Sequence, residues 1–106
     1  MMHKRKRKAL EADGWKVGTA QEFLGLSNHE VALIDLKLAL GRALKARRVR
    51  KRMSQADVAA RIRSSQSRVA KMESGDATVS IDLLVRTLLA LGASRSELAR
   101  SFGSGR

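Results

Sequence analysis

The stretch SQADVAARIRSSQSRVAKMESG, residues 54–75, predicts two short helices joined by a tight turn. Apolar residues recur at helical spacing in each half, with Val58 and Ile62 on one face of the first helix and Val69 and Met72 on one face of the second. The other side of the second helix is polar and cationic, without a carboxylate. Two amphipathic helices at this spacing are typical of a helix-turn-helix, whose second helix lies in the major groove of DNA.

Capping residues and glycines predict where the other helices begin and end. Pairs that fit a capping box are Thr19 with Glu22, Ser27 with Glu30, Ser54 with Asp57, and Ser94 with Glu97. Gly25, Gly75 and Gly92 stand where a helix ends in a left-handed residue. Since no alternating run of β-branched or aromatic residues indicates a strand, we expect an all-α fold. Its six helices are predicted over about 19–24, 28–51, 55–62, 65–73, 81–91 and 95–102.

The longest predicted helix carries apolar residues on two sides. Leu33, Leu40 and Leu44 form one stripe, and Val31, Ile34 and Leu38 form the other. A helix that is apolar on two sides is buried on two sides, so we expect one stripe to meet the helices that follow. The other should meet the N-terminal segment or a second subunit. We therefore expect a flexible basic arm over 1–12, a helical extension over 13–38 and a helix-turn-helix domain over 39–106, with 13–106 as one folded unit.

Positive charge dominates the composition. The 106 residues include 22 Lys and Arg against 10 Asp and Glu, for a net charge of +12. Basic residues gather in HKRKRK, residues 3–8, and between Arg42 and Met72, where Asp57 is the only acid. Such density favours a polyanionic partner, most often nucleic acid. The alternative is a solubilising surface with a basic tail.

Other classes of function are not indicated. His3 and His29 have no Cys or second His nearby, and no nucleotide-binding or nucleophile motif occurs. We therefore expect no enzymatic activity, no metal site and no cofactor. Apolar runs are too short to span a membrane, and no apolar segment follows the basic N-terminus as in a signal peptide. The absence of Cys fits a reducing compartment, so we expect a cytoplasmic location.

Two further binding roles are less favoured by the composition. A basic helix over 42–52 has the charge to bind anionic lipid, but it lacks the Trp, Phe or dense Leu face that such binding needs. RNA binding is less favoured because the sequence lacks the aromatic residues on which bases stack.

From about Leu40 to Leu91 the chain resembles the lambda-repressor-like, or Xre-type, helix-turn-helix family. The segments that carry the resemblance are MSQADVAARI (53–62), SSQSRVAKMESG (64–75) and SIDLLVRTLLALGA (80–93). Upstream, GWKVGTAQEFLGLSNHEVALIDLKLAL (14–40) resembles the N-terminal extension of HigA-like antitoxins within that family. The resemblance implies a compact domain of five to six helices that binds double-stranded DNA as a homodimer, in a bacterial, nucleoid-associated protein.

The resemblance also implies roles for individual residues. Base contacts are expected from Gln66, Ser67, Lys71 and Arg68, and glutamine can bond adenine N6 and N7 together. Phosphate contacts are expected from Gln55, Ser65, Arg47, Arg50, Arg52, Arg61, Arg63, Thr78 and Ser80. Arg48 and Glu73 match an internal ion pair that ties the first helix of the domain to the recognition helix; the alternative for Arg48 is one more phosphate contact.

The chain departs from the family pattern at three points. Arg63 stands in the turn where a glycine is usual, Arg52 stands where another glycine often ends the first helix, and no proline occurs over 76–80. We expect Arg63 to adopt a left-handed backbone, which costs a non-glycine residue about 1 kcal/mol.

Two functions on this scaffold stay open. One is a sequence-specific transcriptional regulator, an autorepressor on a palindromic operator. The other is a HigA-like antitoxin that also neutralises a ribonuclease toxin by protein–protein binding. An exposed apolar surface formed by residues such as Trp15, Phe23, Leu24, Val31 and Ile34 would favour the toxin partner.

Overall fold

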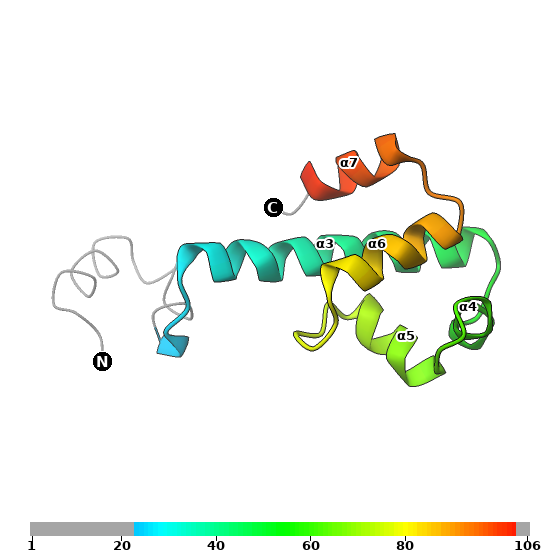
Figure 1. Cartoon of the computed structure of the whole chain (residues 1–106), viewed down its shortest axis with the longest axis horizontal. Helices are drawn as coiled ribbons and strands as arrows, with labels where there is room; N and C mark the ends of the chain where they lie inside the picture. Colours follow the sequence, from blue (N-terminus) through cyan, green and yellow to red (C-terminus); the bar gives the residue numbers. More distant parts are fainter. Residues whose placement is uncertain (1–22, 104–106) are drawn as a thin grey trace, which may run out of the picture. The chain divides into compact units, whose positions relative to one another are not determined.

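The computed structural model describes residues 23–103, which form five helices and no strand (Figure 1). The helices are α3 (Asn28–Arg50), α4 (Gln55–Arg61), α5 (Gln66–Glu73), α6 (Ile81–Ala90) and α7 (Arg95–Gly103). Within the described residues the predicted all-α class is confirmed, and each helix lies close to its predicted range. The predicted arm over 1–12 lies outside the described residues, as does most of the predicted helix over 19–24.

Serine residues begin all five helices. Reciprocal capping boxes join Ser27 with Glu30 at α3, Ser54 with Asp57 at α4, and Ser94 with Glu97 at α7. In each box the hydroxyl accepts from one backbone N–H and the carboxylate accepts from another, so two otherwise unpaired donors are satisfied. α5 and α6 begin at Ser65 and Ser80, whose hydroxyls accept from the backbone N–H of Arg68 and of Leu83.

The chain divides into two compact units, residues 1–32 and 33–106. The boundary falls inside α3, before the predicted start of the helix-turn-helix domain at residue 39. In the first unit the structure describes 23–32, where Phe23 and Leu24 are exposed. The second unit holds the rest of α3 and the four helices that follow.

The core of the second unit draws on all five helices. Its buried residues are Leu40, Leu44, Val58, Ala59, Val69, Met72, Val79, Leu84, Leu88, Leu91, Ala93 and Leu98. The predicted apolar faces of α4 and α5 are confirmed, because Val58, Val69 and Met72 are fully buried. The two stripes of α3 behave differently from the prediction. Leu33 and Ile34 are 45% and 40% exposed, so burial in this helix is concentrated in its second half.

Two glycines bring α3 and the end of α5 into close contact. Gly41 is buried in α3, and a Cβ added there would lie 2.6 Å from the carbonyl oxygen of Met72 and 2.8 Å from that of Glu73. Gly75 ends α5 with a φ of +70°, and a Cβ there would lie 2.7 Å from a methyl group of Leu38. Because the groups facing Gly41 are backbone atoms, which cannot rotate away, this contact fixes the position of α5 against α3.

Candidate nucleic-acid interface

The turn between α4 and α5 passes through a left-handed arginine. Arg63 has a φ of 56°, as its place in the turn predicted, and Arg52, just beyond the end of α3, has a φ of 58°. Both side chains are exposed. A left-handed backbone costs a residue with a Cβ about 1 kcal/mol, so packing of α4 against α5 must hold the turn in place.

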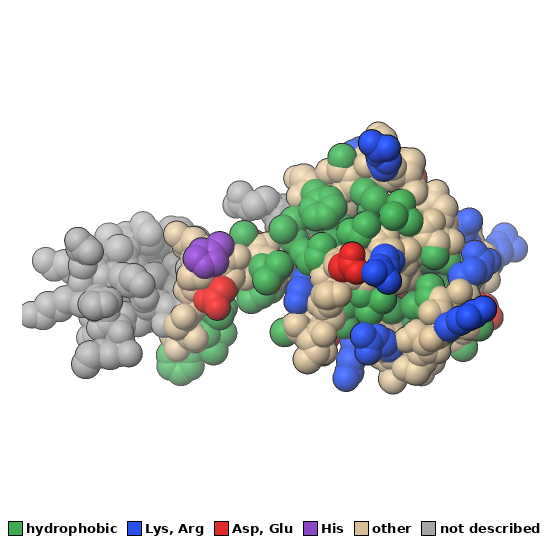
Figure 2. Space-filling model, in the orientation of Figure 1, with side chains coloured by type: hydrophobic (Ala, Val, Ile, Leu, Met, Phe, Trp, Pro, Cys, Tyr) green, Lys and Arg blue, Asp and Glu red, His purple; other side chains and the backbone are tan. Residues whose placement is uncertain are grey.

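α5 exposes only polar and cationic side chains. Gln66, Ser67, Arg68 and Lys71 are exposed, and Figure 2 shows Lys and Arg side chains over α4 and α5. The opposite face is apolar and fully buried. The one carboxylate of this helix belongs to Glu73, and its side chain is only 5% exposed. α5 therefore presents hydrogen-bonding groups and positive charge without a competing negative charge.

A hydrogen-bond network of Arg48, Glu73, Gln55 and Gln66 links α3, α4 and α5. Arg48 Nε lies 2.6 Å from Glu73 Oε2, and Arg48 Nη2 donates to Glu73 Oε1 at 3.1 Å. Gln55 Nε2 donates to the same Oε1 at 3.1 Å, and Gln66 Nε2 donates to Gln55 Oε1 at 2.6 Å. Donation to the Glu73 carboxylate raises the pKa of Arg48. Since a nearly buried carboxylate needs such partners, the network stabilises the position of α5.

The chemistry of the network fixes which way each amide points. A carboxylate only accepts hydrogen bonds, so Gln55 must turn its nitrogen toward Glu73 and its oxygen toward Gln66. Gln66 must then turn its own nitrogen toward Gln55. An amide nitrogen carries two hydrogens, so Gln66 keeps one N–H and its oxygen for an external partner. Gln55 likewise keeps one N–H.

A small cavity of about 160 Å³ opens at the start of α5. It is lined by Ser65, Ser67, Arg68, Lys71, Thr78 and Val79. The lining has two cations and three hydroxyl groups and no carboxylate, a combination that suits a phosphate group. The nearby Asp76 is held by Thr78, whose backbone N–H donates to Asp76 Oδ1 at 2.8 Å. Hydrogen bonds from the hydroxyl and the N–H of Thr78 lower the pKa of Asp76.

Several predicted phosphate contacts already have structural roles. The hydroxyls of Ser65 and Ser80 cap α5 and α6, and the hydroxyl of Thr78 donates to Asp76. Each hydroxyl oxygen has two acceptor sites, but each has one proton only, so Thr78 has no free O–H for a phosphate. Arg61 is exposed at the end of α4.

Arg47 and Arg50 lie on another side of α3 from Arg48, and Arg47 is engaged by α7. Arg47 Nη2 lies 2.6 Å from Glu97 Oε2 of α7, and Arg47 Nη1 donates to the carbonyl of Leu91 at 3.5 Å. Arg50 lines a cavity between α3 and α7 together with Arg47. The reason is helical geometry: Arg48 faces α5, so its neighbour Arg47 is turned about 100° away, and Arg50 lies near Arg47.

Two residues that support the position of α5 were not predicted from the sequence. Lys37 Nζ donates to the carbonyl of Ala77 at 2.9 Å, which ties α3 to the loop after α5. Gly41 makes the close contact described above. A glycine inside a helix lowers its stability, so its presence at position 41 of a strongly predicted helix was a signal in the sequence for a close contact there. No comparable signal pointed from Lys37 to a loop 40 residues away.

Within residues 23–103, no group of three or more His, Cys, Asp or Glu side chains is placed to hold a metal ion. The helices of this part are also too short or too polar to cross a membrane.

Comparison with known proteins identifies one family. A family model described as a helix-turn-helix domain matches residues 39–100, a range that includes α4 and α5 and the network between them. Comparisons with curated proteins and with solved structures gave no significant match.

Proposed function

The chain belongs to the helix-turn-helix domain family, and from this premise we propose that it is a sequence-specific transcriptional regulator that binds a palindromic DNA operator as a homodimer. The family, of the Xre-like kind, indicates DNA as the partner. The proposed mechanism is occlusion of a promoter, its own included, without chemistry. The observation that carries the proposal is the exposed face of α5, which offers amide, hydroxyl and cationic groups without a carboxylate.

The hydrogen-bond network supports base reading by Gln66. Bidentate recognition of adenine needs one N–H donor for N7 and one oxygen acceptor for the N6 amino group. These are the two groups that the bond to Gln55 leaves on Gln66. Because Glu73 fixes the amide orientations, the side chain is preorganised for adenine before DNA arrives. Ser67, Lys71 and Arg68 are the further proposed base contacts.

Phosphate contacts would supply affinity and a steep dependence on salt. The remaining N–H of Gln55 is free to donate to a phosphate oxygen, and Arg68, which lines the cavity at the start of α5, is placed to contact either a phosphate or a guanine. Arg52, Arg61 and Arg63 are exposed cations at the ends of α3 and α4. The hydroxyls of Ser65 and Ser80, which accept from backbone N–H groups, would donate their protons to phosphate oxygens, and Thr78 would first have to release its bond to Asp76.

The dimer would form through apolar surface on the last two helices. Leu89 of α6 is 46% exposed and Phe102 of α7 is 40% exposed, whereas Leu98 is buried in the core. Figure 2 shows hydrophobic side chains gathered over α6 and α7. Exposed apolar side chains of this size favour a protein contact.

Selection of bound sites from random double-stranded DNA tests the proposal directly. We expect a two-fold symmetric consensus whose half-sites lie about one helical turn apart. Recovery of sequences without a consensus would contradict specific recognition, and a single unrepeated half-site would contradict the dimer.

A second candidate function is the antitoxin role, in which the protein also neutralises a toxin. One observation favours it: Phe23 and Leu24 are 84% and 65% exposed, and Ile34 is 40% exposed. Co-expression with the product of the adjacent gene tests this role. Two results together would support it: a stable complex that restores growth to cells making the toxin, and loss of that complex in Phe23→Ser. Absence of a complex would leave the regulator alone.

A further inference from the structure

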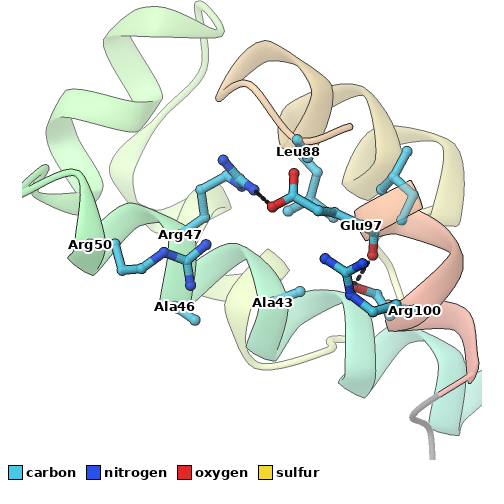
Figure 3. Close-up of a pocket in the computed structure, with 10 residues that line it drawn as sticks. Ala43, Ala46, Arg47, Arg50, Leu88, Glu97 and Arg100 are labelled. Carbon is cyan, nitrogen blue, oxygen red and sulfur yellow. Dashed lines mark hydrogen bonds and ion pairs between the residues drawn. The ribbon is translucent and has the colours of Figure 1, made fainter. Parts of the chain in front are cut away.

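A second cavity lies on the side of α3 that faces away from α5. Its volume is about 280 Å³, just below the usual range for ligand pockets. It is lined by Ala43, Ala46, Arg47, Arg50, Leu88, Ala93, Glu97, Leu98, Arg100 and Ser101. Figure 3 shows the side chains converging from α3, α6 and α7. The α5 residues proposed to read bases do not line it.

The cavity has an excess of positive charge. Three guanidinium groups face one carboxylate, which leaves a formal charge of +2. Arg47 is engaged by Glu97. Arg50 and Arg100 form no ion pair within residues 23–103, and the one hydrogen bond found there for Arg100 is a 3.5 Å contact with Ser96. In Figure 3 their guanidinium groups extend over the cavity from α3 and from α7.

The lining also has an apolar part. Ala43 and Ala46 of α3 line one wall, and Leu88, Ala93 and Leu98 line another. A cavity that combines an apolar wall with two available guanidinium groups suits a molecule with one anionic group and a short apolar body, because guanidinium binds carboxylate and phosphate oxygens in pairs.

We propose that this cavity binds a small organic anion, whose carboxylate or phosphate group contacts Arg50 and Arg100 and whose apolar part lies against Ala43 and Ala46. The volume favours a small molecule over a protein segment. The separation of the cavity from the α5 face makes it a site distinct from the DNA interface proposed above.

Binding would add a link between α3 and α7. At present the described contacts between these helices include the Arg47–Glu97 ion pair and the packing of Leu98 in the core. An anion that bridges Arg50 and Arg100 joins the same two helices a second time. A ligand that binds only the folded chain raises its melting temperature, so the effect is measurable without DNA.

The test uses the full chain without DNA, titrated separately with benzoate, acetate and inorganic phosphate. Backbone amide NMR shifts report the site, and thermal unfolding reports stabilisation. We expect saturable binding in the millimolar range or tighter, with shift changes at Ala43, Ala46 and Ser101. Benzoate binding more tightly than acetate would assign a carboxylate ligand with an apolar body. Binding of phosphate alone would assign a phosphate ligand.

Three variants distinguish the site from general attraction of anions to a basic chain. Arg50→Gln and Arg100→Gln should each weaken binding about tenfold, as expected for loss of a charged hydrogen bond. Arg95→Gln removes the same charge from an exposed position of α7 outside the cavity and should change affinity less than twofold, roughly.

Three outcomes would overturn the proposal. The first is the absence of saturable binding by any of the three anions. The second is an equal loss in Arg95→Gln, which would trace binding to the overall charge. The third is shift changes at the cavity that depend on protein concentration and not on the anion, which would assign it to a protein interface. None of these results bears on whether α5 binds DNA.

Discussion

The two sides of α3 carry the same kind of ion pair in different surroundings. Arg48 pairs with Glu73 of α5 and its neighbour Arg47 pairs with Glu97 of α7, each at 2.6 Å. The side chain of Glu73 is 5% exposed, whereas that of Glu97 is 37% exposed. Loss of a partner leaves an uncompensated charge only where water cannot reach it. Burial of the carboxylate, and not the distance between the charged atoms, therefore separates a pair that holds the fold from one that only supports it.

The packing around the two pairs differs in the same direction. On the α5 side, Gly41 allows the backbone of α3 to approach the backbone of α5, and Glu73 accepts a further hydrogen bond from Gln55. On the α7 side, a cavity of about 280 Å³ remains open beside the pair. α5 is therefore held tightly against α3, while open space remains between α3 and α7.

The largest expected effect is that of Arg48→Ala. It leaves Glu73 buried with Gln55 as its remaining partner, so we expect a loss of about 3 kcal/mol in the free energy of unfolding. Urea or thermal unfolding without DNA measures it, with Arg95→Ala as an exposed control. A loss no greater than that of the control would show that the buried pair does not hold the fold, and would favour Arg48 as a phosphate contact.

Gly41→Ala tests the close contact itself. The added methyl group meets two backbone carbonyls, so we expect a loss of about 1–3 kcal/mol despite the better helix propensity of alanine. Gly103→Ala is the matched control, because a Cβ there meets nothing within 4 Å. If both variants are as stable as the original chain, α5 is not held by this contact.

Gln66→Ala tests whether α5 reads bases, as proposed. We expect a loss of about 1–3 kcal/mol in binding to the selected operator and little change on random DNA. Ser96→Ala, at an exposed position of α7, serves as the control. Equal losses on both kinds of DNA would exclude base reading by Gln66.

Arg47→Ala tests the more exposed pair. We expect a clearly smaller fall in melting temperature than in Arg48→Ala, because water can solvate Glu97 when its partner is removed. DNA affinity and its salt dependence should not change. A flatter salt dependence would show that Arg47 contacts phosphate after all.

The smallest effect concerns two caps, at α4 and at α7. Backbone N–H donation from Ser54 and Ser94 lowers the pKa of Asp57 and of Glu97. The two ionised carboxylates stabilise the folded chain fully above their unfolded pKa values of about 3.9 and 4.3. This stabilisation is lost as the pH falls through the lower pKa values of the folded state. Melting temperatures between about pH 6 and pH 2 should therefore fall less steeply in Asp57→Asn and in Glu97→Gln. An unchanged slope would contradict the caps as its source.

Local signals account for what the sequence predicted well. Serine caps and glycines act within a few residues, so helices such as α4 and α5 lay close to their predicted ranges. The pairing of Arg48 with Glu73 came from family resemblance. Apart from that resemblance, nothing in the sequence separated Arg47 from Arg48, because the direction of each side chain depends on where α5 and α7 pack. Arg47 is turned toward Glu97, which lies far along the chain in α7.

The hydrogen-bond network also limits which side chains position 66 can carry in the base-reading role proposed above. Glu73 fixes the oxygen of Gln55 toward position 66, so a replacement there is tolerated best if it can donate a hydrogen bond. Lysine or arginine, which favour guanine, meet that condition. Glutamate, which would accept from cytosine, does not, because it faces the oxygen of Gln55. Under the proposed role of Gln66, a lineage that changes its operator through this residue alone is thus biased toward purine-reading side chains, and a move to cytosine requires a second change in the network.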